Sequence, residues 1–263
     1  MEKTRHIKFQ RHIDMLQYIT NNGSATIDEL VRTFNVSKAT INRDINALVK
    51  TGNIVKVHGG VISNVNSDEF EMLITDKEHL YVEEKINIAK IACDMVEDDD
   101  NIIIDSGSTM LYFAKELVKR QDIKNVTVIT NDIKVAYTLC SNSEITLIMV
   151  GGTKHKDGYD LYGDSISDVI ISMNISKYFI GSSAWDIKVG ITHTNYSDVL
   201  LKKEFMACAK ESILLSDSSK DALEKKFKIC SIDKLSKIIT DNHLLTERID
   251  EYKKIGVEIV IAC

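Results

Sequence analysis

The sequence predicts a two-domain α/β protein, in which a small helical domain precedes a larger domain built on a mainly parallel sheet. The length of 263 residues suits one small domain and one of about 180 residues that can bury a sizeable core. Residues 26–60 hold two short helical patterns and a β run, whereas short apolar runs alternate with helix-length segments from residue 101 onwards. Charge is divided too, because residues 1–63 hold nine Lys or Arg against five Asp or Glu in a chain of formal net charge −6.

The first two helices are predicted from apolar periodicity and from capping residues. Residues 12–22 place their apolar side chains on one stripe and end before a glycine. Residues 26–35 begin with Thr26 and Glu29, whose side chains can each satisfy a free N–H group of the other's turn. They end at Asn35, a residue type that tolerates a left-handed helix end.

The third helix follows after a connection as short as a helix-turn-helix requires, and Ser37 can cap its start. Ile41, Ile45 and Leu48 fall on one side and are expected to pack inward, with Asp44 toward the same core side. A β run at residues 54–57, followed by glycines, predicts a wing. The residues assigned to DNA contact lie on the other side of the helix, at its start and in the wing: Ser37, Lys38, Ala39, Thr40, Asn42, Arg43, Asn46, Lys50, Lys56 and His58.

This arrangement of side chains suits double-stranded DNA. An α-helix fits the major groove, where Arg can pair with guanine and Asn with adenine in bidentate fashion. Any three-helix bundle with polar outer faces would show similar periodicity, but the basic surplus in an otherwise acidic chain is what a phosphate-binding surface needs. We therefore expect residues 1–63 to form a winged helix-turn-helix DNA-binding domain.

The second half of the chain is expected to be a separate domain of residues 82–263, joined through a polar linker at residues 64–81. It opens with a helix at residues 82–96, with Ile86, Ile88, Ala89, Ala92 and Met95 on or near one side. Unalternating apolar runs separated by helix-length segments then predict a mainly parallel sheet covered on both faces. These runs are residues 102–104, 126–129, 145–150, 178–180, 213–215, 238–239 and 257–261.

Small and polar residues follow five of these runs. Ligands bind beyond the carboxyl ends of the strands in such sheets, and the loop at residues 105–109 leads into a helix whose start favours an anion. Each loop is a weak signal by itself, since Gly, Ser, Asn and Asp end strands everywhere. Together they suit a phosphorylated polyol or sugar. The effector-binding residues are expected to be Asp105, Ser106, Gly107, Ser108, Thr109, Thr130, Asn131, Gly151, Gly152, Lys154, Gly181, Asp217 and Lys220.

Composition excludes several other classes. No run of about 18 apolar residues is present to span a membrane and no leader opens the chain, so a cytoplasmic protein is expected. The five Cys are far apart and mostly within apolar runs, which favours reduced core residues over a disulfide framework or a metal cluster. The seven His lack ligand-like spacing. We expect no metal, no cofactor and no catalytic residue.

Seven short motifs, in this order and spacing, resemble the DeoR family of transcriptional regulators over nearly the whole chain. They are VSKATINRDI at 36–45, VHGG at 57–60, EK at 84–85 followed by IA at 88–89, DSGST at 105–109, ITN at 129–131, GG at 151–152 and DSSK at 217–220. The resemblance implies a winged helix-turn-helix joined to a sensor related in fold to ribose-5-phosphate isomerase and glucosamine-6-phosphate deaminase. It further implies a repressor of a sugar-metabolism operon that a phosphorylated sugar releases from operator DNA.

The chain departs from the family pattern at two informative places. Asn42 precedes Arg43 and Asp44 where the family usually has a second Arg, so one DNA contact is expected to be lost. Asp221 follows Lys220 where an aromatic residue is typical, which would put a carboxylate near the expected phosphate site.

Two alternatives remain beside the repressor. One is a sugar-phosphate isomerase or deaminase-like enzyme with Asp105, Asp132 or Asp217 as base, although an enzyme has no need of a DNA-reading helix and a fold does not carry a function with it. The other is a regulator controlled by a partner protein without a small ligand. A homodimer or homotetramer is expected, since helix-turn-helix proteins usually pair to match palindromic half-sites.

Overall fold

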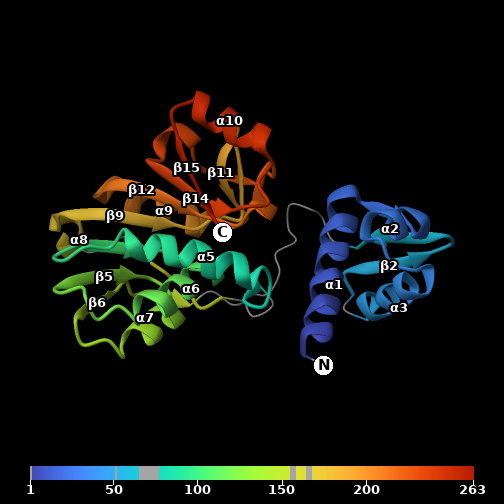
Figure 1. Ribbon diagram of the computed structural model, residues 1–263, viewed down its shortest axis with the longest axis horizontal. Helices are drawn as coiled ribbons and strands as arrows, with labels where there is room; N and C mark the ends of the chain where they lie inside the picture. Colours follow the sequence, from blue (N-terminus) through green and yellow to red (C-terminus); the bar gives the residue numbers. More distant parts are fainter. Residues whose placement is uncertain (1, 51, 65–76, 155–157, 164–167) are drawn as a thin grey trace. The chain divides into compact units, whose positions relative to one another are not determined.

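The protein divides into two compact units, Met1–Met72 and Leu73–Cys263, in a computed structural model (Figure 1). The structure describes residues 2–50, 52–64, 77–154, 158–163 and 168–263. The division falls within residues 64–81, the segment expected to be a linker; most of that segment lies outside the described residues.

In its described residues, the first unit holds three helices and a small antiparallel sheet. Its elements are α1 (Glu2–Asn22), β1 (Ser24–Thr26), α2 (Ile27–Phe34), α3 (Lys38–Val49), β2 (Ile54–Val57) and β3 (Gly60–Ser63). Strand β3 lies between β1 and β2, so the wing is a hairpin completed by a strand that precedes α2. The predicted winged helix-turn-helix is confirmed. Helix α1 starts before residue 12 because residues 2–11 contain neither proline nor glycine.

Local signals explain this first unit well. The Thr26 and Glu29 cap is present, with the Thr26 N–H donating to Glu29 Oε2 at 2.7 Å and the Glu29 N–H donating to Thr26 Oγ1 at 3.2 Å. Asn35 ends α2 in the left-handed region at φ 48°. A side chain at Gly60 would place its Cβ 2.4 Å from the Ala25 carbonyl oxygen, so only glycine permits β3 to approach β1 this closely.

The second unit is built on a seven-stranded sheet, and all of its strand pairs are parallel. The seven apolar runs predicted from the sequence are these seven strands, so the expected fold class is confirmed. The spatial order is β15-β14-β12-β9-β4-β5-β6. Their bounds are β4 (Asn101–Ile104), β5 (Val126–Thr130), β6 (Ile145–Met149), β9 (Ile175–Ile180), β12 (Ala209–Leu215), β14 (Lys237–Asp241) and β15 (Glu258–Ala262).

Helices cover both faces of this sheet (Figure 1). Ile102 and Ile104 of β4 pack in a core with α5 (Val82–Asp94), α6 (Ser108–Leu117) and α7 (Ile133–Leu139). Ile103 of the same strand joins the opposite core with α8 (Asp168–Ser172), α9 (Tyr196–Cys208) and α10 (Thr246–Lys254). Because successive side chains of a strand point to opposite faces, burial on both faces requires the unalternating apolar runs seen in the sequence.

Several short elements outside the seven-stranded sheet were not predicted. A second sheet holds β10 (Ala184–Asp186), β11 (Gly190–His193) and β13 (Phe227–Cys230), and a hairpin holds β7 (Thr153–Lys154) and β8 (Leu161–Tyr162). Two 3₁₀ turns are η1 (Ser218–Lys220) and η2 (Ile232–Lys234).

Two expectations from composition concern the cysteines and membrane-spanning segments. Cys93 is buried, but Cys140 and Cys263 are exposed, so the expectation that the cysteines are core residues was wrong for these two. Within the described ranges, no helix is both long and apolar enough to cross a membrane.

Candidate DNA-binding surface and effector site

The reading helix α3 is held by an apolar inner side and a polar cap. Ile41 and Ile45 are fully buried and Leu48 is nearly so, as the periodicity predicted. The Ser37 hydroxyl accepts a hydrogen bond from the Thr40 N–H at 3.2 Å. This cap accounts for Ser37 structurally, so its assignment to DNA contact stays a proposal.

Most of the side chains assigned to DNA contact are exposed together on α3 and the wing. Thr40 and Asn42 are half-buried, and the other eight are exposed: Ser37, Lys38, Ala39, Arg43, Asn46, Lys50, Lys56 and His58. The Lys56 ammonium donates to Asn46 Oδ1 at 3.3 Å, which joins the wing to the reading helix. Arg43 is exposed on α3, on the side away from the buried Ile41 and Ile45.

Asp44 lies on the core side, as expected, and two partners from α1 hold it there. Its carboxylate accepts from Arg11 Nε at 2.7 Å and lies 2.8 Å from His12 Nε2, with 1% of the side chain exposed. Burial alone would raise the pKa of Asp44, but the hydrogen bonds from Arg11 and His12 outweigh it and lower the pKa. Sequence reasoning missed Arg11 and His12, because nothing local relates them to a residue more than thirty positions away.

Most of the expected effector residues follow strands that lie near the point where the strand order of the sheet reverses, whereas Gly151, Gly152 and Lys154 follow β6 at the end of the sheet. β4 is central, with β5 and β6 on one side and β9, β12, β14 and β15 on the other. Ligands of open parallel sheets bind beyond the carboxyl ends of the strands at such a point. We call the loops that follow β4, β5, β9 and β12, namely residues 105–109, 130–132, 181–183 and 217–220, the switch-point site.

Hydrogen bonds connect these loops to each other. The Gly181 N–H donates to Asp105 Oδ2 at 2.8 Å, and the Gly107 N–H donates to Asp132 Oδ2 at 3.2 Å. Ser182 Oγ lies 3.4 Å from Ser216 Oγ at the end of β12. The switch-point site is therefore one connected structure, although its residues are spread over more than a hundred positions in the chain.

Asp105 organises the centre of the switch-point site. Its side chain is 2% exposed and pairs with the ammonium of Lys202 on α9, a residue that sequence reasoning missed. It also accepts from the Ser106 N–H at 2.9 Å. Burial, and then the charge of Asp105, raise the pKa of Tyr178 well above its usual value. With its oxygens already engaged, Asp105 is better placed to hold the loop than to bind a sugar hydroxyl.

The start of helix α6 forms one wall of the switch-point site. Gly107 precedes the helix at φ 113°, and the space where its Cβ would lie is open. Thr109 Oγ1 is buried and has no hydrogen-bond partner among the described residues. Asp132 also caps α7, accepting from Lys134 N–H at 2.8 Å, and burial raises its pKa. The wall thus offers a helix start and an uncommitted hydroxyl.

Thr130, Asn131 and the glycines after β6 have structural contacts. Asn131 Nδ2 donates to the Leu161 carbonyl at 3.0 Å, which attaches the β7–β8 hairpin beside β5, while Asn131 Oδ1 has no hydrogen-bond partner among the described residues. A Cβ at Gly152 would lie 2.2 Å from the Tyr162 carbonyl oxygen, so glycine is needed there. Gly151 and Lys154 are exposed, and Thr130 is fully buried.

Three charged residues, Asp217, Lys220 and Lys85, lie close together at the loop that follows β12. Asp217 is 1% exposed at its side chain, and its Oδ2 lies 3.5 Å from the Lys220 ammonium in η1. Lys85 of α5 is buried and donates to the carbonyls of Lys77 and Leu80 at 2.5 and 2.7 Å. Burial lowers the pKa of Lys85 to about 7, against the charge of Asp217, which raises it. Lys220 and Lys85 in turn lower the pKa of Asp217 against its burial.

The sequence suggested Lys85 only through the resemblance, because the apolar side of its helix did not include this residue. Lys85 and Cys93 are buried in α5, while Ile86 and Met95 are only half-buried. Asp221 also differs from the expectation, because its carboxylate does not face the switch-point site as an unpaired charge. It forms a double hydrogen bond with Arg248 instead, with both donor–acceptor distances 2.8 Å.

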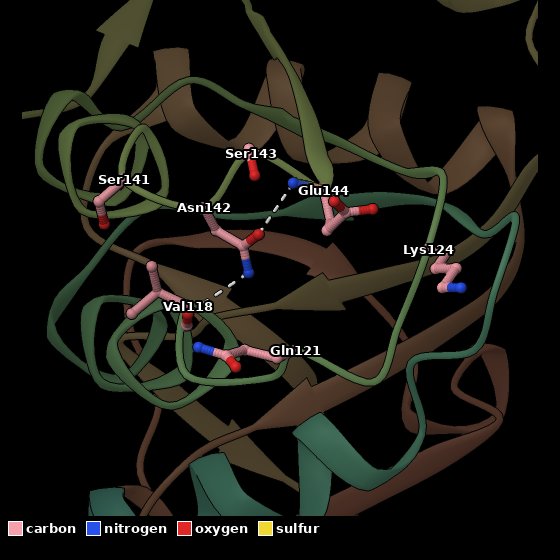
Figure 2. Close-up of a pocket in the computed structure, with 7 residues that line it drawn as sticks. All are labelled: Val118, Gln121, Lys124, Ser141, Asn142, Ser143 and Glu144. Atoms are coloured by element: carbon pink, nitrogen blue, oxygen red, sulfur yellow. Dashed lines mark hydrogen bonds between the residues drawn. The ribbon is translucent and has the colours of Figure 1, made fainter.

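A separate polar hollow of about 520 Å³ lies at the amino ends of β5 and β6 (Figure 2). It is formed by the loops that precede β5 and β6, and it is lined by Val118, Gln121, Lys124, Ser141, Asn142, Ser143 and Glu144. Asn142 closes these loops by donating to the carbonyls of Val118 and Arg120 at 3.3 and 3.0 Å. In the part of the chain that the structure describes, no group of three or more His, Cys, Asp or Glu is placed to hold a metal ion.

A winged helix-turn-helix joined to a parallel α/β domain with a polar switch-point site is the design of a transcriptional regulator with its own sensor. The model of the DeoR-like helix-turn-helix domain matches residues 11–67, and that of the DeoR C terminal sensor domain matches residues 81–242. The chain belongs to the DeoR family, and it is a DNA-binding transcriptional regulator.

Individual relatives agree with this membership over nearly their full lengths. The HTH-type transcriptional regulator IolR of Bacillus subtilis (strain 168) is 32% identical over 239 residues, which cover 90% of this chain and 93% of the relative. A lactose phosphotransferase system repressor of Staphylococcus epidermidis is 28% identical over 253 residues, or 94% and 98% of the two chains. Ribose 5-phosphate isomerase A of Methanocaldococcus jannaschii is similar in fold alone, with 19% identity, coverage of 52% and 53%, and a TM-score of 0.39.

Proposed function

We propose that this regulator represses an operon of sugar metabolism and that a phosphorylated sugar releases it from operator DNA. The observation that carries the proposal is that the start of α6 and the Lys220 ammonium both belong to loops of the switch-point site. The free N–H groups at the start of α6 favour an anion. Lys220, partly exposed on the loop that follows β12, adds positive charge. A phosphate group can accept hydrogen bonds from the N–H groups of the helix start and pair with the Lys220 ammonium.

The sugar part of the effector has polar partners on the same site. Thr109 Oγ1 and Asn131 Oδ1 are buried without hydrogen-bond partners among the described residues, and such groups gain most from a ligand that supplies one. The names of relatives support the same substrate class, since one is a repressor of a lactose phosphotransferase system. The proposal does not specify the sugar.

The route from effector to DNA runs through residues 77–81, which lead along the chain toward the DNA-binding unit. Lys85 holds the carbonyls of Lys77 and Leu80, Tyr112 Oη donates to the Glu78 carbonyl at 3.0 Å, and Lys134 pairs with the Glu78 carboxylate. A phosphate that draws on Lys85 or shifts the start of α7 would weaken these attachments. We infer that effector binding alters the hold of the sensor on this segment.

We propose no catalytic activity for the site. The three carboxylates considered as bases are Asp105, Asp132 and Asp217, and each is buried and engaged in structural hydrogen bonds or an ion pair. Measured turnover of ribose 5-phosphate or glucosamine 6-phosphate would overturn the proposal that the site has no catalytic activity.

The protein is proposed to act as a homodimer or homotetramer on a palindromic operator.

The proposal is tested by operator affinity with and without sugar phosphates, in parent and in Lys220→Ala. The variant should bind operator like the parent but no longer be released. Lys234→Ala is the matched control. Lys234 is an exposed lysine in the other 3₁₀ turn, η2, which precedes β14 and so lies at the amino end of that strand. In the same panel, a ligand at 100 times its dissociation constant should stabilise the parent by about 2.7 kcal/mol in thermal unfolding.

Each outcome of this experiment has a distinct meaning. Release of Lys220→Ala by the same ligand would remove Lys220 from the effector site. Weaker operator binding by the variant without ligand would show that the substitution disturbs the fold. A panel that neither stabilises nor releases the parent would favour regulation by a partner protein.

A further inference from the structure

The turn that carries Asp217 and Lys220 is held in place by residues outside the switch-point site. η1 is a single 3₁₀ turn closed by two backbone hydrogen bonds, from Lys220 N–H to Asp217 and from Asp221 N–H to Ser218, at 3.2 and 3.0 Å. Ala222 follows at φ 57°, a region that side-chain-bearing residues disfavour. So short a turn has little stability of its own and requires external contacts.

One contact holds the start of the turn. Asp241, at the end of β14 and 2% exposed, accepts from the Ser218 N–H and the Ser218 hydroxyl, each at 2.7 Å. It also accepts from the His243 N–H at 2.9 Å. The beginning of η1 is thereby attached to a neighbouring strand of the sheet.

A second contact holds the end of the turn. The guanidinium of Arg248, on α10, donates to both oxygens of Asp221, and Tyr252 Oη donates to Asp221 Oδ1 at 2.6 Å. Arg248 is oriented in turn by Asp186 at 3.2 Å. Asp221 and Arg248 are 8% and 18% exposed, so the pair is largely shielded from solvent. A planar guanidinium fixes the direction of a carboxylate as well as its position.

We propose that Arg248 is a positioning residue of the effector site. By fixing Asp221, it sets where the adjacent Lys220 ammonium stands relative to Asp217 and the start of α6. The residue acts through Lys220 and does not touch the ligand. This inference rests on the proposed function, because it assigns Arg248 a part in the phosphate site formed by Lys220. It also gives Asp221, the departure from the family pattern, a role.

The test compares the affinity of the full-length protein for inorganic phosphate and for ribose 5-phosphate, obtained from thermal-shift titrations. Arg248→Lys keeps the charge but loses the double hydrogen bond, and Asp221→Asn keeps the shape but loses the charge. Each should weaken phosphate binding by about tenfold, which corresponds to about 1.4 kcal/mol of binding free energy. Operator affinity in the absence of ligand should stay at the parent's value.

A matched control separates positioning from general loss of stability. Glu251 also contacts Arg248, at 2.9 Å, but it is half-exposed and does not touch the turn. Glu251→Gln should therefore bind phosphate as the parent does. A merely structural Arg248 would lower the melting temperature of Arg248→Lys while leaving phosphate affinity unchanged. In a Lys220→Ala background, Asp221→Asn should cause no further loss of affinity, because both act on one contact.

Failure of this inference is distinguishable from failure of the proposed function. If the parent does not bind phosphate, or if Lys220→Ala binds it equally well, the phosphate site is overturned and the role of Arg248 with it. If the parent binds through Lys220 while Arg248→Lys and Asp221→Asn bind as tightly as Glu251→Gln, only the positioning role is overturned. Should Arg248→Lys fail to fold, Asp221→Asn decides the question.

Discussion

The carboxylate of Asp105 and the ammonium of Lys202 form an ion pair that is almost completely buried, with 2% and 4% of the two side chains exposed. Asp105 ends the central strand β4 and Lys202 lies on α9, which packs on the opposite face of the sheet from α6. Lys202 also approaches the Gly181 carbonyl at 3.5 Å. The pair therefore connects both sides of the point where the strand order reverses.

Lys202→Met should destabilise the sensor unit by about 3–5 kcal/mol, because it leaves the Asp105 carboxylate buried without its counter-charge. The measurement is urea unfolding followed by the fluorescence of Trp185, the single tryptophan of the chain, which lies in the second unit and is fully buried. Lys203→Met is the control, since Lys203 is the exposed neighbour. Equal stability of the two variants would show that the ion pair has no structural role.

Arg43→Ala should weaken operator binding by about 1–3 kcal/mol if Arg43 contacts a base, with relaxed preference at one operator position. The thermal melt should hardly change, because Arg43 is exposed while Ile41 and Ile45 on the inner side are fully buried. Electrophoretic mobility shifts with operator and with single-base variants measure this. Unchanged operator binding by Arg43→Ala, together with loss of binding by Ile45→Ala, would mean that the reading side is assigned wrongly.

Operator affinity should fall steeply with salt concentration, because each phosphate neutralised by a basic residue of the first unit releases counterions. Lys56→Ala should reduce the slope of log affinity against log salt by about one, if Lys56 contacts a phosphate. The loss of its 3.3 Å hydrogen bond to Asn46 is a second, salt-independent effect. Titrations at several salt concentrations separate the two. A flat salt response in the parent would exclude phosphate contacts.

Lys85 should make the stability of the sensor unit depend on pH. Its pKa is lowered by burial to about 7 in the folded protein, whereas an unfolded lysine has a pKa of about 10.4. Between these values the unfolded chain binds more protons, so the free energy of unfolding should rise with pH by at most about 1.4 kcal/mol per unit. The upper limit of the useful window is about pH 8.5, where unfolded thiols begin to ionise.

The measurement is the unfolding free energy by Trp185 fluorescence across that window, in parent and in Lys85→Met. Cys93 and Cys230, whose pKa values are raised by burial to about 12 and 11, act in the opposite direction above the window. The difference between parent and variant removes them, since both proteins contain the same thiols. If this difference does not change with pH, Lys85 does not release its proton in the folded protein.

Glu78→Gln should uncouple effector binding from DNA release, because it removes the ion pair with Lys134 that holds residues 77–81. Effector affinity should remain near the parent's, while the ratio of operator affinities without and with effector should move toward one. Glu116→Gln is the control, because it removes the ion pair between Glu116 and Lys119 in the same unit, which does not involve residues 77–81. A full response in Glu78→Gln would exclude this attachment as the route.

The sequence by itself determined the class of both units, for reasons that lie within short segments. Capping at Thr26 and Ser37 and the apolar side of α3 depend on residues three or four positions apart, and these are visible in a linear chain. Burial on both faces required seven unalternating apolar runs, and those runs are the strands. The small-residue loops that follow the strands could also be predicted, because each is a short continuous segment of the sequence.

Only the tertiary structure decided which side chains meet. The pairs Arg11 with Asp44, Lys202 with Asp105 and Arg248 with Asp221 each bring together residues that are far apart in sequence. Charged residues give no periodic signal when they are buried singly, so the apolar pattern of α5 included the half-buried Ile86 and not the buried Lys85. A buried charge is stable only beside its partner, and that partner is chosen by the packing of strands and helices in three dimensions.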